Sequence, residues 1–193
     1  MFIKATKKGW IALIVLPLLL LAVVLGARPA LRAYFQAVYP VKYWDTVVAE
    51  AEKNELDPAL VLAIIRTESR FKPEALSGAD AHGLMQVTPI TLKWAQYRSP
   101  ELKSLQTENL FDPHTNIRVG TYVLALLLES YPETDTALAA YNAGFGHVAE
   151  WLADDRYSAD GKTLHTIPFS ETAQYVKKVN HALTVYQELY DWL

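Results

Sequence analysis

Residues 57–71 read DPALVLAIIRTESRF, and this stretch decides the fold that the sequence predicts. The Asp57 side chain can accept a hydrogen bond from a free backbone N–H at a helix start, and Pro58 has the fixed backbone angle of a first helical residue. An apolar run without glycine follows. The stretch therefore predicts a helix that opens at Asp57 and continues to about Ser69.

Glu68 is the chemically interesting residue of this helix. Leu60, Ile64 and Glu68 are spaced four apart and so share one face, which places the carboxyl group at the end of an apolar stripe. Partial burial disfavours the charged form, and the helix C-terminus repels an anion, so both effects raise the pKa of Glu68. A carboxylic acid that stays protonated near neutral pH is suited to general acid catalysis. Spacing alone also allows a glutamate that merely reaches solvent at a frayed helix end.

The same start signal, a capping side chain followed by proline, occurs twice more. Thr88 precedes Pro89. Asp112 precedes Pro113 at the head of a long stretch with helical apolar periodicity, which ends near Ser130. Both sites predict helix starts.

Two further helices are predicted without a proline. Thr134 or Asp135 can cap a short helix through Tyr141, and Ser170 can cap a last helix that runs to the C-terminus. Two polar segments that contain glycine and proline are expected as loops: 72–83 and 154–169. Since no segment alternates like a strand with hairpin turns, the predicted class is mainly α, with many short helices around one core.

The N-terminal part of the chain differs from the rest. Residues 10–27 read WIALIVLPLLLLAVVLGA and carry no charge; as a helix they would span about 27 Å, close to the thickness of the hydrocarbon core of a membrane. Basic residues flank this run on both sides: Lys4, Lys7, Lys8, Arg28 and Arg32. We therefore predict a cytoplasmic N-terminus at 1–9, a transmembrane anchor at 10–27 and a linker at 28–42. A cleaved signal peptide is the competing interpretation, but the run is longer than usual.

Residues 43–193 are expected to form the exported domain, on the extracytoplasmic side of a single-pass anchor in the cytoplasmic membrane. The whole chain of 193 residues has a formal net charge of −3, but residues 40–193 hold 13 basic and 21 acidic residues, or −8. An acidic domain is not expected to bind nucleic acid. The absence of cysteine excludes disulfides, thiolate metal sites and a cysteine nucleophile.

Several short motifs occur in a characteristic order along the predicted domain: Glu68-Ser69-Arg70-Phe71, Ala75-Leu76-Ser77, His82-Gly83-Leu84-Met85-Gln86, Ala139-Ala140-Tyr141-Asn142-Ala143-Gly144 and Ile167 to Val176. Together they resemble the lytic transglycosylases of the soluble murein-degrading type. The resemblance covers about residues 40–190 and implies a lysozyme-like multi-helix domain of the goose type.

The resemblance also implies roles for individual residues. Glu68 matches the single catalytic acid and base. Seven further positions match residues that orient substrate or line the cleft: Ser77, Met85, Gln86, Tyr141, Asn142, Glu171 and Tyr175. Met85 could also fill the core, and Tyr175 could be a buried aromatic residue with a satisfied hydroxyl. Asp80 stands where the family usually has glycine, and we interpret it as a turn residue.

The implied reaction is cleavage of the β-1,4 bond between N-acetylmuramic acid and N-acetylglucosamine in peptidoglycan, with a 1,6-anhydro product and no water consumed. The implied partners are peptidoglycan glycan strands and, through residues 10–27, the cytoplasmic membrane; no metal or other cofactor is expected. Two alternatives remain open. One is a muramidase, a hydrolase on the same fold, in which Asp80 or Glu74 would activate water. The other is a module that binds peptidoglycan without cleaving it.

Overall fold

The structure is a computed structural model that describes the backbone of residues 7–190 and the side chains of residues 15–23 and 25–190. Most of the predicted cytoplasmic segment 1–9 and the end of the last predicted segment, including Trp192, lie outside the described residues. The chain divides into two compact units, residues 1–40 and residues 41–193.

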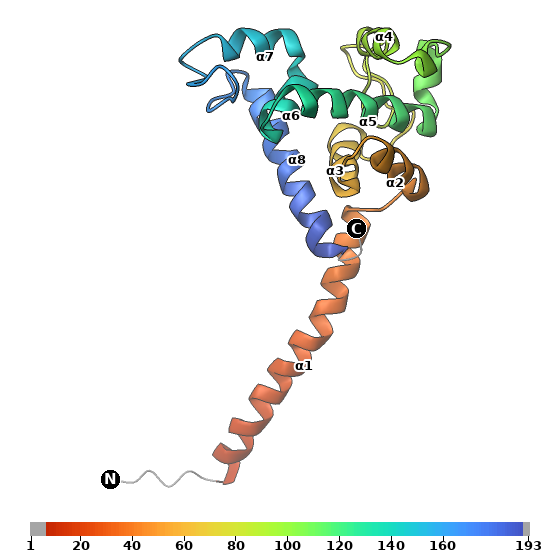
Figure 1. Cartoon of the computed structure of the whole chain (residues 1–193). Helices are drawn as coiled ribbons and strands as arrows, with labels where there is room; N and C mark the ends of the chain where they lie inside the picture. The colour runs from red at the N-terminus through yellow and green to blue at the C-terminus, as the bar shows by residue number, and fades with distance from the viewer. Residues whose placement is uncertain (1–6, 191–193) are drawn as a thin grey trace. The chain divides into compact units, whose positions relative to one another are not determined.

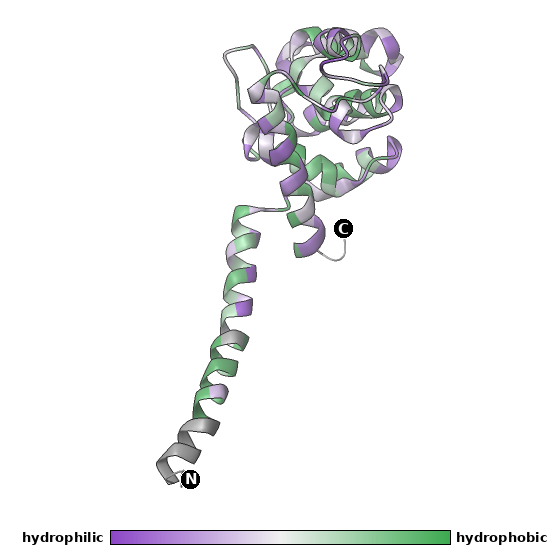
Figure 2. Cartoon of the chain, turned by 90° about the vertical axis from the view of Figure 1, so that its left-hand side faces the viewer, coloured by the Kyte–Doolittle hydropathy of each residue, from purple (hydrophilic) through white to green (hydrophobic). Residues whose placement is uncertain are grey.

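The first unit is built on one long helix, α1 (Lys7–Val38). The stretch Val15–Val38 is long and apolar enough to cross a membrane, and Figure 2 shows that hydrophobic residues dominate the described part of this helix. We expected a linker from residue 28, but the helix runs on to Val38. Apart from Pro29, the segment RPALRAYFQAV is rich in good helix formers, which explains why no loop begins at Arg28.

The second unit is a bundle of short helices (Figure 1). The helices are α2 (Trp44–Lys53), α3 (Pro58–Ser69), α4 (Pro89–Arg98), α5 (Pro113–Ser130), α6 (Thr134–Ala143), α7 (Phe145–Leu152) and α8 (Ser170–Leu189), with short 3₁₀ turns η1 (Pro100–Leu102) and η2 (Thr107–Phe111). Within residues 7–190 there is no β-strand, and only isolated bridges join His82 to Leu76 and Val87. The mainly α class predicted from the sequence is confirmed.

Three helix starts form as the sequence predicts. Asp57 accepts a hydrogen bond from the backbone N–H of Ala59 at 2.8 Å, and Asp112 accepts one from Thr115 at 2.8 Å. Thr88 caps α4 in the same way. These side chains satisfy N–H groups that the helix itself leaves unpaired.

Other boundaries differ from the prediction. Thr134 and Ser170 are first helical residues rather than caps, because Glu133 and Phe169 occupy the capping positions. The sequence analysis did not predict α2 or α7. These two helices follow Tyr43 and Gly144, which adopt positive φ angles, and neither start carries a side-chain cap or a proline.

Helix α3 lies at the centre of the bundle. Its residues from Ala59 to Ile65 are all buried, so the helix is covered on every side. It packs mainly against α8 and α2, while α5 packs against α2, α4 and α6. The burial of α3 places Glu68, near its C-terminal end, at the margin of the core.

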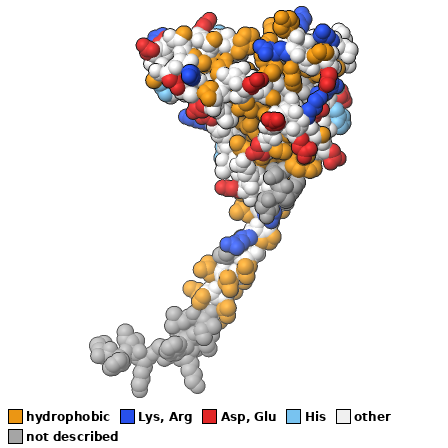
Figure 3. Space-filling model, viewed as in Figure 1, with side chains coloured by type: hydrophobic (Ala, Val, Ile, Leu, Met, Phe, Trp, Pro, Cys, Tyr) orange, Lys and Arg blue, Asp and Glu red, His pale blue; other side chains and the backbone are white. Residues whose placement is uncertain are grey.

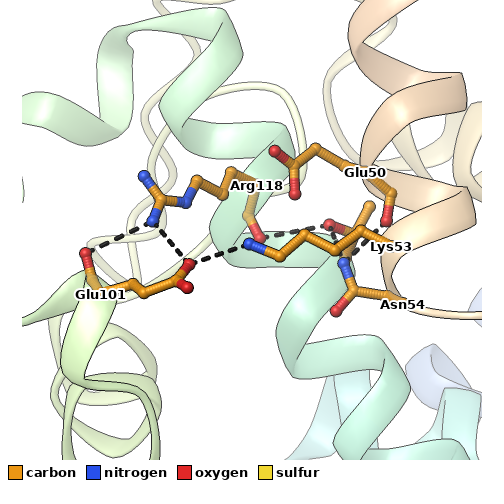
Figure 4. Close-up of polar contacts among 6 residues, drawn as sticks. Glu50, Lys53, Asn54, Glu101 and Arg118 are labelled. Carbon is orange, nitrogen blue, oxygen red and sulfur yellow. Dashed lines mark hydrogen bonds and ion pairs between the residues drawn. The ribbon is translucent and has the colours of Figure 1, made fainter.

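An exposed ion-pair network joins α2, η1 and α5 (Figure 4). The Glu101 carboxylate lies 2.9 Å from Lys53 Nζ and 3.2 Å from an Arg118 guanidinium nitrogen. Hydrogen bonding and charge from Lys53, with a smaller contribution from Arg118, lower the pKa of Glu101. Acidic and basic side chains are spread over the surface of the unit in Figure 3, and solvent-exposed pairs of this kind add little stability.

The buried Asn116 of α5 holds the loop at residues 82–86 against the core. Its Oδ1 atom accepts a hydrogen bond from Met85 N–H at 2.7 Å, and its Nδ2 atom donates to the carbonyls of His82 at 2.8 Å and Leu110 at 2.7 Å. Gly83 has φ +72° here, and a Cβ atom on it would lie 2.4 Å from Asn116 Nδ2. Only glycine therefore allows the loop to approach this closely.

We predict that Asn116→Ala lowers the free energy of unfolding by about 2–5 kcal/mol, because one buried N–H and two buried carbonyls lose their partner. Urea unfolding of the full chain in detergent measures the change. Glu129→Ala, at an exposed position on the same helix, is the matched control and should change stability by less than about 0.5 kcal/mol. Equal stability of the Asn116 variant and the wild type would contradict the assigned role of this side chain.

Candidate active site

Glu68 lies in the last turn of α3, where the backbone turns away sharply. The next residue, Ser69, is buried, and its hydroxyl donates to the carbonyl of Leu84 at 2.8 Å. Arg70 and Phe71 follow with φ angles of 53° and 60°, which non-glycine residues rarely adopt. The end of α3 is thus tied to the loop at residues 82–86 and followed by two strained residues, an arrangement often found at functional sites.

The electrostatic environment of Glu68 favours the neutral acid. Burial raises the pKa of this half-buried carboxyl from 4.5 to about 7. The nearby hydroxyl of Tyr175 acts in the opposite direction, because a donor stabilises the carboxylate. The raised pKa predicted from the sequence is therefore confirmed, with desolvation as its main cause.

A cleft of about 410 Å³ opens in front of Glu68. It is lined by residues from six separate parts of the chain: Glu68, Ser77, Gly78, Ala79, Ala81, Gln86, Val87, Thr88, Thr91, Val123, Tyr141, Asn142 and Glu171. Six of the eight site residues predicted from the sequence are in this set. Met85 and Tyr175 are the two that are not.

Ser77 organises one wall of the cleft. Its hydroxyl oxygen accepts hydrogen bonds from the backbone N–H groups of Ala79 at 3.2 Å and Ala81 at 3.1 Å. Between them, Asp80 has φ +59°, as expected of a turn residue, and its carboxylate lies 2.8 Å from Nε2 of His82. Neither Asp80 nor Glu74 lines the cleft.

The Gln86 side chain stabilises the same loop through hydrogen bonds to its backbone. Its backbone has φ +50°, and its side-chain amide donates to the carbonyls of Gly83 at 2.9 Å and Ala75 at 3.2 Å. The side chain therefore stabilises a strained backbone at the edge of the cleft.

Met85 is a correction to the sequence prediction. Its side chain is fully buried and packs so closely on Gly120 that a Cβ atom there would lie 2.5 Å from the sulfur. It cannot touch a ligand in the cleft. Its backbone carbonyl instead accepts a hydrogen bond from the hydroxyl of Tyr141 at 2.8 Å, so Met85 positions a cleft residue from behind.

Tyr175 also differs from the expectation that it forms the cleft floor. The residue is 6% exposed, and its buried hydroxyl lies near the Glu68 carboxyl but makes no hydrogen bond of regular geometry with any described residue. Burial, followed by the charge of Glu68, raises the pKa of both Tyr175 and Tyr141 well above the usual value. Both phenols are therefore neutral, and Tyr175 acts on Glu68 rather than on the cleft surface.

Some of the residues that line the cleft were not predicted from the sequence. Thr88 carried only a helix-start signal, Thr91 was not singled out at all, and Val123 lies in the apolar stripe of α5. A hollow beside the cleft, here called the late-motif hollow, shares Asn142 and Glu171 with it and is lined by residues 168–172 of the predicted late motif. No local pattern distinguishes Thr88, Thr91 and Val123 from ordinary helix residues.

One protein-family model matches the part of the chain that contains Glu68 and most of the cleft. The model of the transglycosylase SLT domain matches residues 45–164. This chain belongs to the transglycosylase SLT family. The match begins near the start of α2 and ends in the loop before α8, so it contains Glu68 and most of the cleft.

Relatives within the SLT family show the same similarity. The membrane-bound lytic murein transglycosylase C of Serratia proteamaculans is 37% identical over 168 residues, which cover 76% of this chain and 47% of that protein. The soluble lytic murein transglycosylase of Escherichia coli is 34% identical over 145 residues, which cover 73% of this chain and 22% of that protein. The chain thus spans less than half the length of these relatives.

Solved structures of lytic transglycosylases have a fold similar to that of this chain. The 70-kDa soluble lytic transglycosylase of Escherichia coli aligns with a TM-score of 0.70 and 29% identity, over 80% of this chain and 25% of that one. An inactive mutant of the lytic transglycosylase Slt from Pseudomonas aeruginosa aligns with a TM-score of 0.69 and 36% identity, over 79% and 25%. The expected lysozyme-like helical domain of the SLT type is confirmed.

We predict that Glu68→Gln stabilises the protein at alkaline pH. The folded pKa of about 7 exceeds the reference value of 4.5, so the wild type loses stability as the pH rises between them. At pH 8 the variant should be more stable by up to about 3 kcal/mol, and below pH 4 the difference should vanish. Unfolding measured across this range tests the sign, with the exposed Glu129→Gln as control; a Glu68 variant less stable at pH 8 would refute the raised pKa.

Proposed function

We propose that this chain is a membrane-anchored lytic transglycosylase that cleaves the β-1,4 bond between N-acetylmuramic acid and N-acetylglucosamine in peptidoglycan. The observation that carries the proposal is Glu68, a half-buried acid with a pKa of about 7 that faces a cleft. The names of its relatives, membrane-bound and soluble lytic murein transglycosylases, agree with this substrate.

In the first step, Glu68 donates its proton to the oxygen between the two sugars. Most glycoside hydrolases then need a second carboxylate as base or nucleophile. Here the acetamido carbonyl of the muramic residue stabilises C1 as the bond breaks, in a substrate-assisted manner. One protein carboxyl group is therefore sufficient.

In the second step, the Glu68 carboxylate removes the proton from the C6 hydroxyl of the same sugar. The hydroxyl oxygen attacks C1 and closes a 1,6-anhydro ring, so the proton returns to Glu68 and no water is added. A tethered hydroxyl has a high effective concentration when the sugar is held in the right pucker. Holding that pucker is the task of the cleft.

The remaining cleft residues hold and orient the glycan. Ser77 and Gln86 present polar groups to the cleft, and the exposed Asn142 and Glu171 also line it. Tyr141, whose hydroxyl is engaged by Met85, offers its ring to the bound sugar. We assign Tyr175 and Met85 to positioning rather than to substrate contact.

We further propose that α1 anchors the domain in the cytoplasmic membrane as a single pass. Residues 10–27 would span the hydrocarbon core, and the lysines in segment 1–9 favour a cytoplasmic N-terminus. The domain at residues 43–193 then lies on the extracytoplasmic side, where peptidoglycan is found, and residues 28–42 connect the two. Residues 28–38 of this connection are helical.

We predict that the full chain, added to purified sacculi, releases products that end in 1,6-anhydromuramic acid. Glu68→Gln should lose nearly all cleavage, because an amide cannot supply the proton, and should still bind sacculi. Mass spectrometry of the products measures this. Products one water heavier would establish a muramidase, and binding of the wild type without any cleavage would establish a binding module.

We also predict the pH profile of cleavage. The acid must be protonated in the free enzyme, so kcat/KM should fall above a pH of about 7. Tyr175→Phe removes the hydroxyl that lowers the pKa of Glu68, and the alkaline limb should therefore move to higher pH. Tyr97→Phe, at an exposed position, is the control and should leave the profile unchanged. A limb that moves to lower pH in the Tyr175 variant would contradict the assignment.

A further inference from the structure

The catalytic cleft continues into a second hollow of about 270 Å³. The two share a border made of five residues: Thr88, Thr91, Val123, Tyr141 and Asn142. Beyond that border the walls are mostly apolar and come from α4, α5 and the turn between α6 and α7. The cleft and this hollow therefore form one continuous groove.

Two aromatic side chains meet at this part of the groove. Trp94 belongs to α4 and Phe145 is the first residue of α7, and both line the second hollow. Their ring centres lie 5.7 Å apart, with an angle of 24° between the ring planes. In Figure 1, α4 and α7 stand on either side of the upper part of the bundle, with α5 and α6 below them. The ring pair connects the two sides.

The pair leaves no passage between the rings. Carbon atoms in contact lie about 3.5–4.0 Å apart, so a sugar inserted between two ring faces would need them about 7–8 Å apart. The observed separation of 5.7 Å is smaller. The guanidinium of Arg98, 4.9 Å from the centre of the Trp94 ring, helps to hold the indole in place.

We propose that the Trp94–Phe145 pair closes one end of the glycan groove, so that a strand can enter only with its terminus and is cleaved near that terminus. This inference rests on the proposed function and adds to it the mode of attack. The late-motif hollow shares Asn142 and Glu171 with the catalytic cleft and carries no such pair among its lining residues. The ring pair thus blocks the groove beyond Asn142, while the cleft also opens past Glu171 into the late-motif hollow, which leaves room for a chain.

The first experiment follows product length during digestion of purified, uncrosslinked glycan strands by the full chain in detergent. The wild type should release short fragments of one size from the start, while the remaining strands shorten gradually. Phe145→Ala should open the groove and raise the mean length of early fragments several-fold. Tyr97→Ala removes an exposed aromatic side chain of α4 that does not line the groove, and it should leave the distribution unchanged.

Two results would overturn the proposal. Fragments of many intermediate lengths from the wild type would mean that strands already pass across the ring pair. An unchanged distribution in both Phe145→Ala and Trp94→Ala would mean that the pair does not limit entry.

A second experiment does not depend on cleavage. In the Glu68→Gln background, β-1,4-linked N-acetylglucosamine oligomers of increasing length are titrated by calorimetry. If the groove is closed, the affinity of the Glu68→Gln protein for the oligomers should stop rising at a shorter length than the affinity of the same protein that also carries Phe145→Ala. An identical dependence of affinity on oligomer length in the two proteins would overturn the proposal. If the wild type produces no fragments at all, the proposed function fails, and this titration still decides whether the groove is closed.

Discussion

The three hydrogen bonds of the Asn116 side chain are the constraint on which the site depends. They fix the backbone of His82 and Met85 against α5, with Gly83 fitted so tightly that no side chain could replace its hydrogen. The Met85 carbonyl then holds Tyr141, and the Leu84 carbonyl holds Ser69 next to Glu68. A single buried amide with all its partners satisfied thus links α3, α5 and α6 around the cleft.

The burial that suits Glu68 to acid catalysis also lowers the free energy of unfolding at alkaline pH. Helix α3 is covered on every side, and this burial is what raises the pKa of the carboxyl to about 7. The strained turn at Arg70 and Phe71 ends the helix directly behind it. Tyr175 partly offsets the desolvation, so the acid remains able to ionise near neutral pH. A more deeply buried acid would stay protonated and could not act as a base in the second step.

The elements that could be predicted are those with a local chemical cause. Helices α3, α4 and α5 start with a capping side chain and a proline, and they begin where the sequence predicts. Helices α2 and α7 start after residues with positive φ and lack such a cap, so nothing in the local pattern marked them. The turn at Asp80 was predictable because aspartate tolerates this backbone conformation.

The sequence by itself determined the helical class and the apolar N-terminal segment, and it pointed to Glu68 and to five of the twelve other residues that line its cleft. Only the tertiary structure decided which way neighbouring side chains point. It buried Met85 while it left Gln86 at the cleft, and it brought Trp94 and Phe145 into contact although 51 positions separate them in the chain. The physical reason is that capping, periodicity and motif spacing are local properties. Burial and contact between distant residues depend on how whole helices pack together.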